Sequence, residues 1–434
     1  MKIAVIGGGI SGLGCAQALT PEFDVTLYEA APRLGGHTNT VDVTLDGTTY
    51  PVDTGFLVFN ERTYPNLIAL FDRLGVPTAK SDMSFGVSVP LPGAGGRRLE
   101  WSGCDLDTVF AQRRNLASPA FLSMLADLLR FNRQATALAK AQVGAQQSDL
   151  SLGDFLDRNG YGQPFRDWYL LPMAGAIWSC PLPTMLAYPA ATFIRFCHNH
   201  GLLQVNDRPQ WFTVRGGARQ YVQKIAARLP DVRVDNPVLE VVRNAASGKV
   251  TVRSRHGTAS YDHVVLACHS DQSQRLLVDA DAGERDLLAA CAYQPNRALL
   301  HTDAALMPRL RKVWSAWNYL SDGSAADGGG NVAVTYLLNK LQPLPFSTPL
   351  FVSLNPLTEP DPRSVIAEFD YSHPIFDRAA VAAQKRLPAL QGRRGVWFAG
   401  AWTGYGFHED GLKSGLAVAE ALTALARHTA RRAA

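Results

Sequence analysis

Three glycines near the start of the chain have a spacing that suits the binding of a dinucleotide. Gly7, Gly9 and Gly12 form the pattern G-x-G-x-x-G, which follows an apolar run and precedes a helix-like run. In this pattern the first glycine permits a tight turn, the second lets the backbone approach a pyrophosphate, and the third lets helix and strand pack closely. Glu29 ends the next apolar run, seventeen residues after Gly12, where a carboxylate can accept hydrogen bonds from ribose hydroxyls. The stretch therefore predicts a pyrophosphate site at a helix N-terminus.

Two further stretches extend this predicted site. Arg33 is followed by Gly35 and Gly36, and a glycine pair permits close approach of the backbone to a phosphate with which the arginine can pair. Near the end of the chain, the strand-like run 396–399 leads into a loop and a helix predicted from about Gly411 to Arg427. A helix start at this place can stabilise the negative charge that a flavin gains on reduction. A simple NAD-binding unit does not need the stretch at 33–38, whereas an extended FAD uses both stretches, so FAD is the predicted cofactor.

The elements that must position these residues alternate along the chain. Strand-like runs at 2–6 and 25–29 enclose a helix predicted at 14–19, which is the first half of a doubly wound α/β unit. We therefore predict an α/β fold in which a Rossmann-type, doubly wound FAD-binding domain is interleaved with an α+β substrate domain. The FAD-binding domain is predicted to comprise residues 1–80, 212–270 and 391–434, and the substrate domain residues 81–211 and 271–390.

The order of these motifs resembles that of the superfamily of flavin-containing amine oxidases, phytoene desaturases and protoporphyrinogen oxidases. The matching stretches run from one end of the chain to the other: 5–12, 28–38, 52–56, 215–217, 238–242, 264–268 and 398–415. More narrowly, the chain resembles a bacterial family of predicted FAD/NAD-binding proteins associated with cyclopropane fatty-acid synthases, in the segments 33–40, 175–181, 198–203, 300–303 and 405–415. A member type of that family is implicated in oxidising methyl-branched acyl chains on the way to furan fatty acids. The resemblance implies an amine-oxidase-like two-domain fold and an FAD-dependent oxidoreductase, similar to a desaturase or dehydrogenase, that acts on a lipid acyl chain.

The resemblance also implies which residues contact FAD, from its pyrophosphate to its flavin ring. These residues are Gly7, Gly9, Ser11, Gly12, Glu29, Arg33, Gly36, His37, Thr38, Gly55, Phe56, Val238, Gly400, Ala401, Gly411 and Leu412. The first four would hold the pyrophosphate and Glu29 the ribose, while residues 33–38 would line the path to the flavin. Gly55 and Phe56 would lie beside the flavin, and the backbone of Val238 would meet the adenine. The last four would meet the ribityl chain and the pyrimidine edge.

Several positions depart from the pattern of the superfamily. The glycine pair is usually followed by arginine, which is His37 here, and the glycine after the last strand is usually followed by an acid, which is Ala401 here. Amine oxidases place a tyrosine of their aromatic cage where this chain has His408, and the lysine that they hold over the flavin falls near Asn296 and Arg297. These last two changes argue against amine oxidation. The sequence leaves the electron acceptor open.

Three side chains are candidates for proton transfer: His408, His301 and Asp303. Because a flavin accepts a hydride itself, the protein has to orient the substrate carbon and exclude water, and a base takes the second proton. His408 is the first candidate since it should lie by the flavin, although a histidine or aspartate at a strand end often forms only structural hydrogen bonds. His198 and His200 have no further ligands at metal spacing, so no metal site is predicted.

Three functions are compatible with these residues. The leading interpretation is an FAD-dependent oxidoreductase that takes a hydride from a carbon of an apolar substrate, above all a lipid acyl chain, in fatty-acid desaturation or oxidation. The second is a flavin amine oxidase that produces peroxide. The third is a non-catalytic lipid-binding or prenyl-binding protein on the same fold. Bound flavin distinguishes the third from the others, and reduction by amines distinguishes the second from the first.

Composition limits the partners and the cellular compartment that we expect for the protein. Hydrophobic residues make up 47% of the chain and its net charge is +4, so no nucleic-acid partner is expected. Six cysteines without a C-x-x-C pair indicate a reduced, cytoplasmic protein, and no apolar run reaches transmembrane length. Short basic clusters, among them Arg113-Arg114 and residues 309–312, are either solvated surface or a peripheral contact with the inner face of the membrane.

Overall fold

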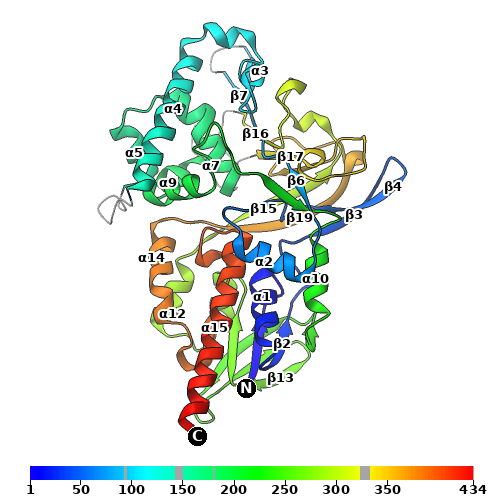
Figure 1. Ribbon diagram of the computed structural model, residues 1–434, viewed down its shortest axis with the longest axis vertical. Coiled ribbons are helices and arrows are strands. Elements are labelled where there is room, and N and C mark those ends of the chain that lie inside the picture. The colour runs from blue at the N-terminus through cyan, green and yellow to red at the C-terminus, as the bar shows by residue number, and fades with distance from the viewer. Residues whose placement is uncertain (92–94, 142–149, 179–180, 323–332, 434) are drawn as a thin grey trace.

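The computed structural model describes residues 1–91, 95–141, 150–178, 181–322 and 333–433. Figure 1 shows an elongated molecule in which both chain termini lie in the lower half, while the helices between residues 106 and 199 lie in the upper half. Residues 179–180, which include Cys180 and belong to one of the family-like segments, lie outside the described residues. Among the helices of the described ranges, none combines the length and the apolar character needed to cross a membrane.

A five-stranded parallel sheet forms the centre of the lower half. Its strands follow the order β10-β2-β1-β14-β20 and pair in parallel throughout. Their bounds are β1 Lys2–Ile6, β2 Asp24–Tyr28, β10 Asp231–Arg233, β14 His263–Leu266 and β20 Val396–Phe398. Most of these residues are apolar and buried, as expected for strands with both faces covered. Parallel pairing of strands from three distant parts of the chain confirms the predicted Rossmann-type fold.

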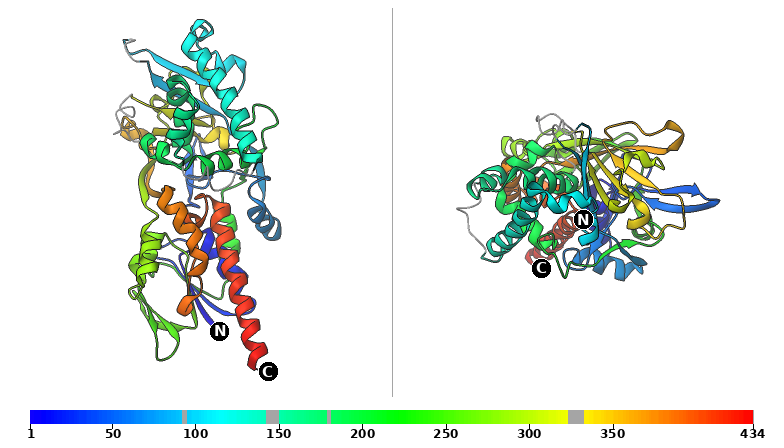
Figure 2. Two further views of the ribbon diagram at one scale, coloured as in Figure 1. Left: turned by 90° about the vertical axis from the view of Figure 1, so that its left-hand side faces the viewer. Right: turned by 90° about the horizontal axis from the view of Figure 1, so that it is seen from above.

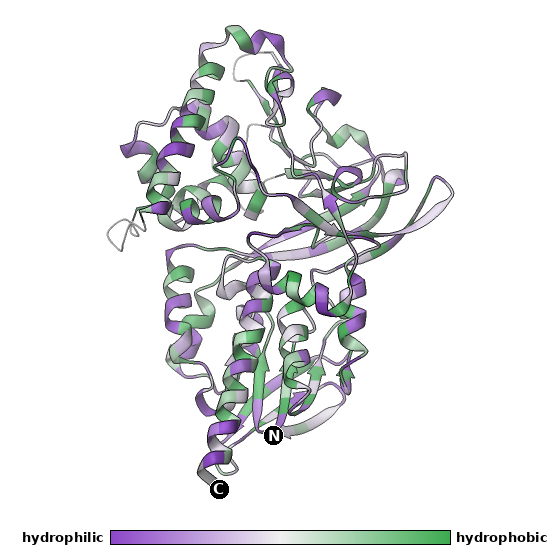
Figure 3. Cartoon of the chain, in the orientation of Figure 1, coloured by the Kyte–Doolittle hydropathy of each residue, from purple (hydrophilic) through white to green (hydrophobic). Residues whose placement is uncertain are grey.

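Three helices pack together on one face of this sheet: α1 (Ile10–Leu19), α10 (Arg219–Ala226) and α15 (His408–Ala433). Ile3 and Val5 of β1 share one apolar core with Leu13 and Leu412 of the helices. Both α1 and α15 begin a few residues earlier than the sequence predicts. Figure 3 shows polar and apolar residues alternating along α15, as expected for a helix with one buried face.

The opposite face of the sheet carries a second layer. It contains the antiparallel strands β11 (Val238–Asn244), β12 (Lys249–Ser254) and β13 (Gly257–Tyr261), and the helices α11 (Ser270–Leu276), α12 (Ala282–Ala289) and α14 (Arg378–Arg386). Leu287 of α12 and Ala380 of α14 share a core with Val264 and Val396 of the sheet. The predicted domain boundaries at 270 and 391 would assign α11, α12 and α14 to the other domain. We propose that these helices belong to the FAD-binding domain, because they bury its sheet.

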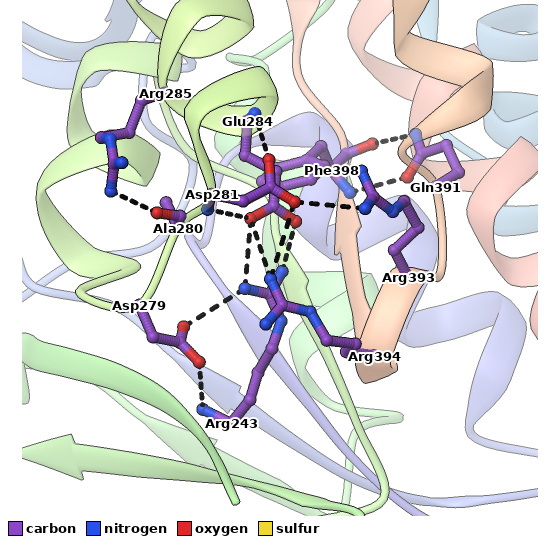
Figure 4. Close-up of polar contacts among 10 residues, drawn as sticks. All are labelled: Arg243, Asp279, Ala280, Asp281, Glu284, Arg285, Gln391, Arg393, Arg394 and Phe398. Atoms are coloured by element: carbon purple, nitrogen blue, oxygen red, sulfur yellow. Dashed lines mark hydrogen bonds and ion pairs between the residues drawn. The ribbon is translucent and has the colours of Figure 1, made fainter. Parts of the chain in front are cut away.

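A buried ion network ties the small antiparallel sheet to α12. Arg243 pairs with Glu284 at 2.5 Å, and the two side chains are only 5% and 0% exposed. Arg243 also pairs with Asp279 at 3.2 Å, and Arg394 approaches Glu284 at 3.5 Å (Figure 4). Asp281 caps α12 by accepting a hydrogen bond from the N–H of Glu284 at 2.9 Å. The network thus joins β11, α12 and the segment that leads into β20.

The upper half is built from a seven-stranded sheet and a group of helices (Figures 1 and 2). The sheet has the order β19-β15-β18-β17-β16-β7-β8 and is antiparallel except for β16 and β7. Its strands are β7 Phe85–Pro90, β8 Arg98–Ser102, β15 Tyr293–His301, β16 Trp317–Leu320, β17 Ala333–Leu337, β18 Phe351–Leu354 and β19 Val365–Pro374. The helices are α3 Leu106–Val109, α4 Pro119–Lys140, α5 Leu152–Arg158, α6 Gln163–Phe165, α7 Leu171–Trp178, α8 Leu182–Ala187 and α9 Ala190–Asn199.

Short elements connect the two halves. They are the hairpin β3 (Thr40–Leu45) and β4 (Thr48–Asp53), the small sheet of β5 (Phe59–Asn60), β9 (Trp211–Val214) and β6 (Thr78–Ser81), and the helices α2 (Pro65–Leu74) and α13 (Leu338–Leu341). Gln342, just after α13, exchanges two hydrogen bonds of 2.9 Å with the backbone of Asp53. These bonds tie the β3–β4 hairpin to the segment that follows β17 of the seven-stranded sheet.

Candidate functional site

The glycine turn after β1 leaves an open surface at the start of α1. A Cβ atom added to Gly12 would lie 1.9 Å from the carbonyl oxygen of Gly7, so only glycine lets α1 pack this closely on the turn. A Cβ atom added to Gly9 would meet no atom within 4 Å. Gly9 directly precedes the first turn of α1, where backbone N–H groups have no partner within the helix. A phosphate can therefore approach the helix N-terminus at Gly9.

Glu29 follows β2 and its carboxylate turns back to the glycine turn. The carboxylate accepts hydrogen bonds from the N–H groups of Gly8 and Ala31, both at 2.7 Å. The backbone oxygen of Glu29 accepts a hydrogen bond of 3.0 Å from the N–H of Asn236, which brings the start of β11, and with it Val238, to the same edge. The residues predicted to meet ribose and adenine therefore lie together beside the turn.

The N-terminal part of α15 lies against that of α1. A Cβ atom added to Gly411 would lie 2.9 Å from the hydroxyl oxygen of Ser11. Leu412 is fully buried, and Gly400 donates its N–H to the hydroxyl of Ser414 at 2.9 Å, which ties the end of β20 to α15. The positive ends of two helix dipoles therefore converge, as an anionic ligand requires.

The loop between β20 and α15 is held by Asp410, which the sequence analysis did not single out. Asp410 accepts a hydrogen bond from the N–H of Phe407 at 3.0 Å, and burial raises the pKa of Asp410 to about 6. The carbonyl oxygen of Ala401 accepts hydrogen bonds of 3.1 Å from the N–H groups of Gly404 and Gly406. Ala401 thus leads into a tight turn, and its position needs no carboxylate to hold the loop.

The segment after β2 folds over the glycine turn. Gly35 donates its N–H to the carbonyl oxygen of Gly8 at 2.8 Å, and a Cβ atom on Gly36 would lie 3.4 Å from the Cα atom of Gly9. The guanidinium group of Arg33 donates a hydrogen bond to the carbonyl oxygen of Gly36 at 3.1 Å. The structure therefore brings together three of the residues predicted to lie along the diphosphate, namely Gly9, Arg33 and Gly36.

Three histidines and a tyrosine gather around the position where the superfamily has arginine. The ring centre of His37 lies 5.1 Å from that of Tyr371 and 5.4 Å from that of His373. The ring centre of His269 lies 6.2 Å away from that of His37. Burial and the neighbouring histidines hold the pKa of His37 well below its usual value, and burial lowers the pKa of His373 to about 4. The cluster is therefore uncharged at neutral pH.

One atom of this cluster is available to a ligand. The Nε2 atom of His37 is buried and has no hydrogen-bond partner. Buried polar atoms are normally satisfied, so an atom of this kind is a position where a bound group can supply the missing hydrogen bond. Arginine at this position would carry a charge, whereas His37 offers a neutral donor or acceptor.

His408 lies at the start of α15 and contacts two predicted flavin-side residues. Its ring stacks on Phe56 with ring centres 3.8 Å apart. Its Nε2 atom lies 2.9 Å from the hydroxyl oxygen of Thr38 and 3.0 Å from that of Tyr221. Burial lowers the pKa of His408 to about 3. A Cβ atom on Gly55 would lie 2.2 Å from the carbonyl oxygen of His37, so Gly55 and Phe56 belong to the same group.

His301 and Asp303 lie elsewhere. His301 is fully buried at the far end of β15, where its Nε2 atom lies 2.8 Å from the hydroxyl oxygen of Ser353 and its Nδ1 atom accepts the N–H of Asp303 at 3.1 Å. Asp303 caps a short 3-10 turn by accepting the N–H of Ala305. His301 is five residues beyond Asn296 on β15, which corresponds to about 16 Å of extended strand. The two side chains therefore serve local structure and are not brought to His408.

The two residues near the position of the amine-oxidase lysine point in different directions. Asn296 is buried and its amide nitrogen lies 2.8 Å from the Nδ1 atom of His373, so it belongs to the histidine cluster. Arg297 forms ion pairs with Glu359 and Glu368, both at 2.6 Å, with 40% of its own side chain exposed. The residue on the site side of the strand is therefore an uncharged amide.

Asp53 lies in the stretch 52–56 that resembles the superfamily, and it has a structural role that the sequence did not indicate. Its two carboxylate oxygens both lie 2.9 Å from the N–H of Ala218, at the N-terminus of α10, and the hydroxyl of Thr40 donates to one of them. Asp53 is 1% exposed, and burial raises its pKa to about 7, against the hydrogen bonds that lower it. Asp53 therefore fixes α10, which carries Tyr221, beside the site.

Substitution of Asp53 by asparagine is expected to change how the stability of the protein without cofactor depends on pH. The folded protein holds the proton of Asp53 more tightly than the unfolded chain does, since the pKa is raised from 3.8 to about 7. The resulting stabilisation is complete below pH ~4 and is lost as the pH rises through ~7. Between these values the free energy of unfolding of the wild type, relative to Asp53→Asn, should fall on the order of 4 kcal/mol. Denaturant unfolding at a series of pH values measures this difference, and a constant difference would contradict the assignment.

The residues present fit FAD. The open surface at Gly9, the two converging helix N-termini and the unpaired Nε2 atom of His37 together suit an extended anionic cofactor. A model of the family described as flavin containing amine oxidoreductase matches residues 10–302. The chain belongs to this family. The predicted FAD cofactor and the predicted class, FAD-dependent oxidoreductase, are thereby confirmed.

Curated relatives of this family member include two carotenoid phi-ring synthases. The one from Streptomyces griseus is 29% identical over 308 residues, which cover 67% of this chain and 56% of the relative. The one from Chlorobaculum tepidum is 32% identical over 126 residues, which cover 28% of this chain and 19% of the relative. The matched region thus spans about half the length of the first relative and less of the second.

Solved structures share the fold of this family member over almost their whole length. A fatty acid isomerase from P. acnes that produces CLA superposes with a TM-score of 0.67 at 17% identity, covering 97% of both chains. Cyclohexylamine oxidase from Brevibacterium oxydans superposes with a TM-score of 0.68 at 18% identity, covering 97% of this chain and 99% of that one. At these identities the structures establish the two-domain fold and nothing about the substrate.

Proposed function

We propose that this FAD-dependent oxidoreductase takes a hydride from a carbon of an apolar substrate, above all a lipid acyl chain. The observation that carries the proposal is the lack of charge where the predicted flavin-side residues meet. Burial holds the pKa values of His37, His269, His373 and His408 below the ordinary histidine value. Such an uncharged group favours an apolar carbon chain, because an ammonium group would lose its hydration there without a partner of opposite charge.

The aromatic surroundings of the loop before α15 support the same substrate class. Phe407 stacks on Phe196 of α9 with ring centres 5.2 Å apart, and Tyr405 lies 5.7 Å from the same ring. Trp178 of α7 donates its indole N–H to the carbonyl oxygen of Tyr405 at 3.4 Å. The start of α15 therefore meets an apolar, aromatic part of the helical region. The name of the related carotenoid phi-ring synthase agrees with an apolar substrate.

Within this proposal FAD, when bound, accepts the hydride, and the chain supplies position and a dry environment. Gly9 and Arg33 would hold the phosphate side of the cofactor, His37 would line the path from there to the flavin, and Gly55 and Phe56 would lie beside the flavin ring. His408 is better suited to orient the hydroxyls of Thr38 and Tyr221 than to remove a proton, since its lowered pKa makes it a weak base. Besides the hydride, the substrate loses one proton. That proton therefore passes to a group other than His408 or to a water molecule.

The visible spectrum of the FAD-loaded protein under anaerobic conditions tests the proposal. Phospholipid with methyl-branched or cyclopropane acyl chains should bleach the oxidised flavin, and mass spectrometry should find acyl chains that have lost two hydrogens. Putrescine and benzylamine, as matched amine probes, should leave the spectrum unchanged. Bleaching by amines alone would replace the proposal with amine oxidation. Bleaching by a carotenoid but not by acyl lipid would support an apolar substrate and contradict the proposal that the substrate is an acyl chain.

A further inference from the structure

Exposed leucines gather at the end of the molecule that lies farthest from the chain termini. We call Leu106, Leu116 and Leu122 the leucine patch; their exposed fractions are 78%, 54% and 44%. They belong to α3, to the 3-10 turn Arg113–Ala117 and to the first turns of α4. Figure 1 shows α3 and α4 at the upper tip of the molecule, away from the lower half that carries the glycine turn. Single exposed leucines are common, but several on neighbouring elements at one end, with polar residues around them, mark an interaction surface.

Side-chain contacts hold the elements of the leucine patch together. The ring of Phe110, which follows α3, packs on that of Phe121 in α4 with ring centres 5.8 Å apart. Asp107 of α3 pairs with Arg113 of the 3-10 turn at 2.5 Å. These contacts therefore join α3, the 3-10 turn and the start of α4, the three elements on which the leucines are exposed.

Basic residues surround the leucine patch. The segments 105–116 and 309–312 contain five basic residues and two acidic ones. All five basic residues are exposed: Arg113, Arg114, Arg309, Arg311 and Lys312. Lys312 pairs with Asp107, so the second segment lies directly beside α3. Arg113 shares the same carboxylate, which leaves an excess of positive charge around the apolar side chains.

We infer that the leucine patch docks on the surface of a membrane that contains anionic lipids. Leucine side chains enter the boundary between headgroups and acyl chains, and neighbouring arginine and lysine side chains pair with anionic headgroups. Five basic residues against two acidic ones give the two segments an excess of positive charge, which a surface of anionic headgroups complements better than a protein surface of mixed charge does. The inference rests on the exposed residues of α3 and α4 and does not depend on the proposed substrate.

Vesicle flotation with the FAD-loaded full-length protein tests this inference. The protein should float with vesicles of equimolar phosphatidylcholine and phosphatidylglycerol, and much less with phosphatidylcholine alone. The variant Leu106→Ser/Leu116→Ser/Leu122→Ser should lower the bound fraction at least tenfold. The variant Arg309→Glu/Arg311→Glu should lower binding to the anionic vesicles in particular and make it insensitive to salt. Unchanged flavin absorbance shows that each variant is folded.

The matched control replaces exposed apolar residues outside the leucine patch. Leu239→Ser/Val278→Ser removes side chains that are 45% and 53% exposed near β11, and it should bind vesicles as the wild type does. The inference is overturned if the wild type does not float with anionic vesicles, or if the control loses as much binding as the leucine variant. It is also overturned if sedimentation shows a dimer that the leucine substitutions dissociate, since the surface would then bind a second copy of the chain.

Discussion

Replacement of Gly9 by asparagine is expected to abolish FAD binding while the protein without cofactor stays folded. A Cβ atom at this position meets no protein atom within 4 Å, and the backbone is extended, so the fold tolerates a side chain. Asparagine is also a favourable residue directly before a helix. The same side chain would occupy the space through which the backbone approaches the pyrophosphate. We expect affinity for FAD to fall at least ~100-fold, which corresponds to about 2.7 kcal/mol.

Fluorescence titration of the flavin-free protein with FAD measures this loss, and circular dichroism measures the fold. Gly47→Asn is the matched control, because Gly47 lies in the β3–β4 turn and a Cβ atom there also meets nothing within 4 Å. Its left-handed backbone, with φ of 74°, is one that asparagine tolerates. The control should bind FAD as the wild type does. Normal FAD affinity in Gly9→Asn would show that the pyrophosphate does not lie at this turn.

Removal of the carboxylate of Glu284 is expected to destabilise the protein by about 3–5 kcal/mol. Glu284 is fully buried and pairs with Arg243 at 2.5 Å, so Glu284→Ala leaves a buried guanidinium group without its closest partner (Figure 4). The substitution also removes a hydrogen bond of 2.9 Å from the N–H of Asp281 to Glu284 at the start of α12. The midpoint and slope of denaturant unfolding, followed by far-ultraviolet circular dichroism, measure the change.

A neighbouring ion pair provides the control for this prediction. Glu240 and Arg253 lie on the same small sheet and pair at 2.7 Å, but their side chains are 40% and 47% exposed. Glu240→Ala should therefore change stability little, because solvent screens an exposed pair. Replacing both Arg243 and Glu284 by methionine and leucine should recover much of the loss, since no buried charge is then left unpaired. Equal effects of Glu284→Ala and Glu240→Ala would show that burial of the network contributes nothing.

The parts of the site that could be predicted from the sequence are the residues whose role depends only on neighbouring residues in the chain. Gly7, Gly9, Gly12 and Glu29 lie within one strand-turn-helix-strand unit, and each is needed for a backbone or capping reason that a short motif expresses. The two-domain fold could be predicted because the motifs of this chain follow one another in the same order as those of the superfamily that it resembles. The domain boundaries were harder to predict, since α12 comes just before β15 and α14 just after β19 of the seven-stranded sheet, yet both helices share a core with the parallel sheet.

The catalytic candidates show why the rest required the structure. His408 and His301 both stand at the end of an element, and only the resemblance of residues 405–415 to a flavin-binding segment favours His408. The path of β15 carries His301 away into a buried contact with Ser353, whereas the start of α15 places His408 against Phe56. Asp53 and Asp410 were missed as buried acids because burial depends on which elements pack around a residue.

By itself the sequence determined the cofactor, the fold class and the glycine turn at the start of α1, because local spacing controls backbone conformation and helix ends. Only the tertiary structure decided which side chains share the site and in which protonation state. His37, His269 and His373 come from three distant segments, and their neutral state arises from mutual proximity and burial. Which residues lie close together and which are buried cannot be read from their separation along the chain. The protonation states of the site are therefore known only from the folded structure.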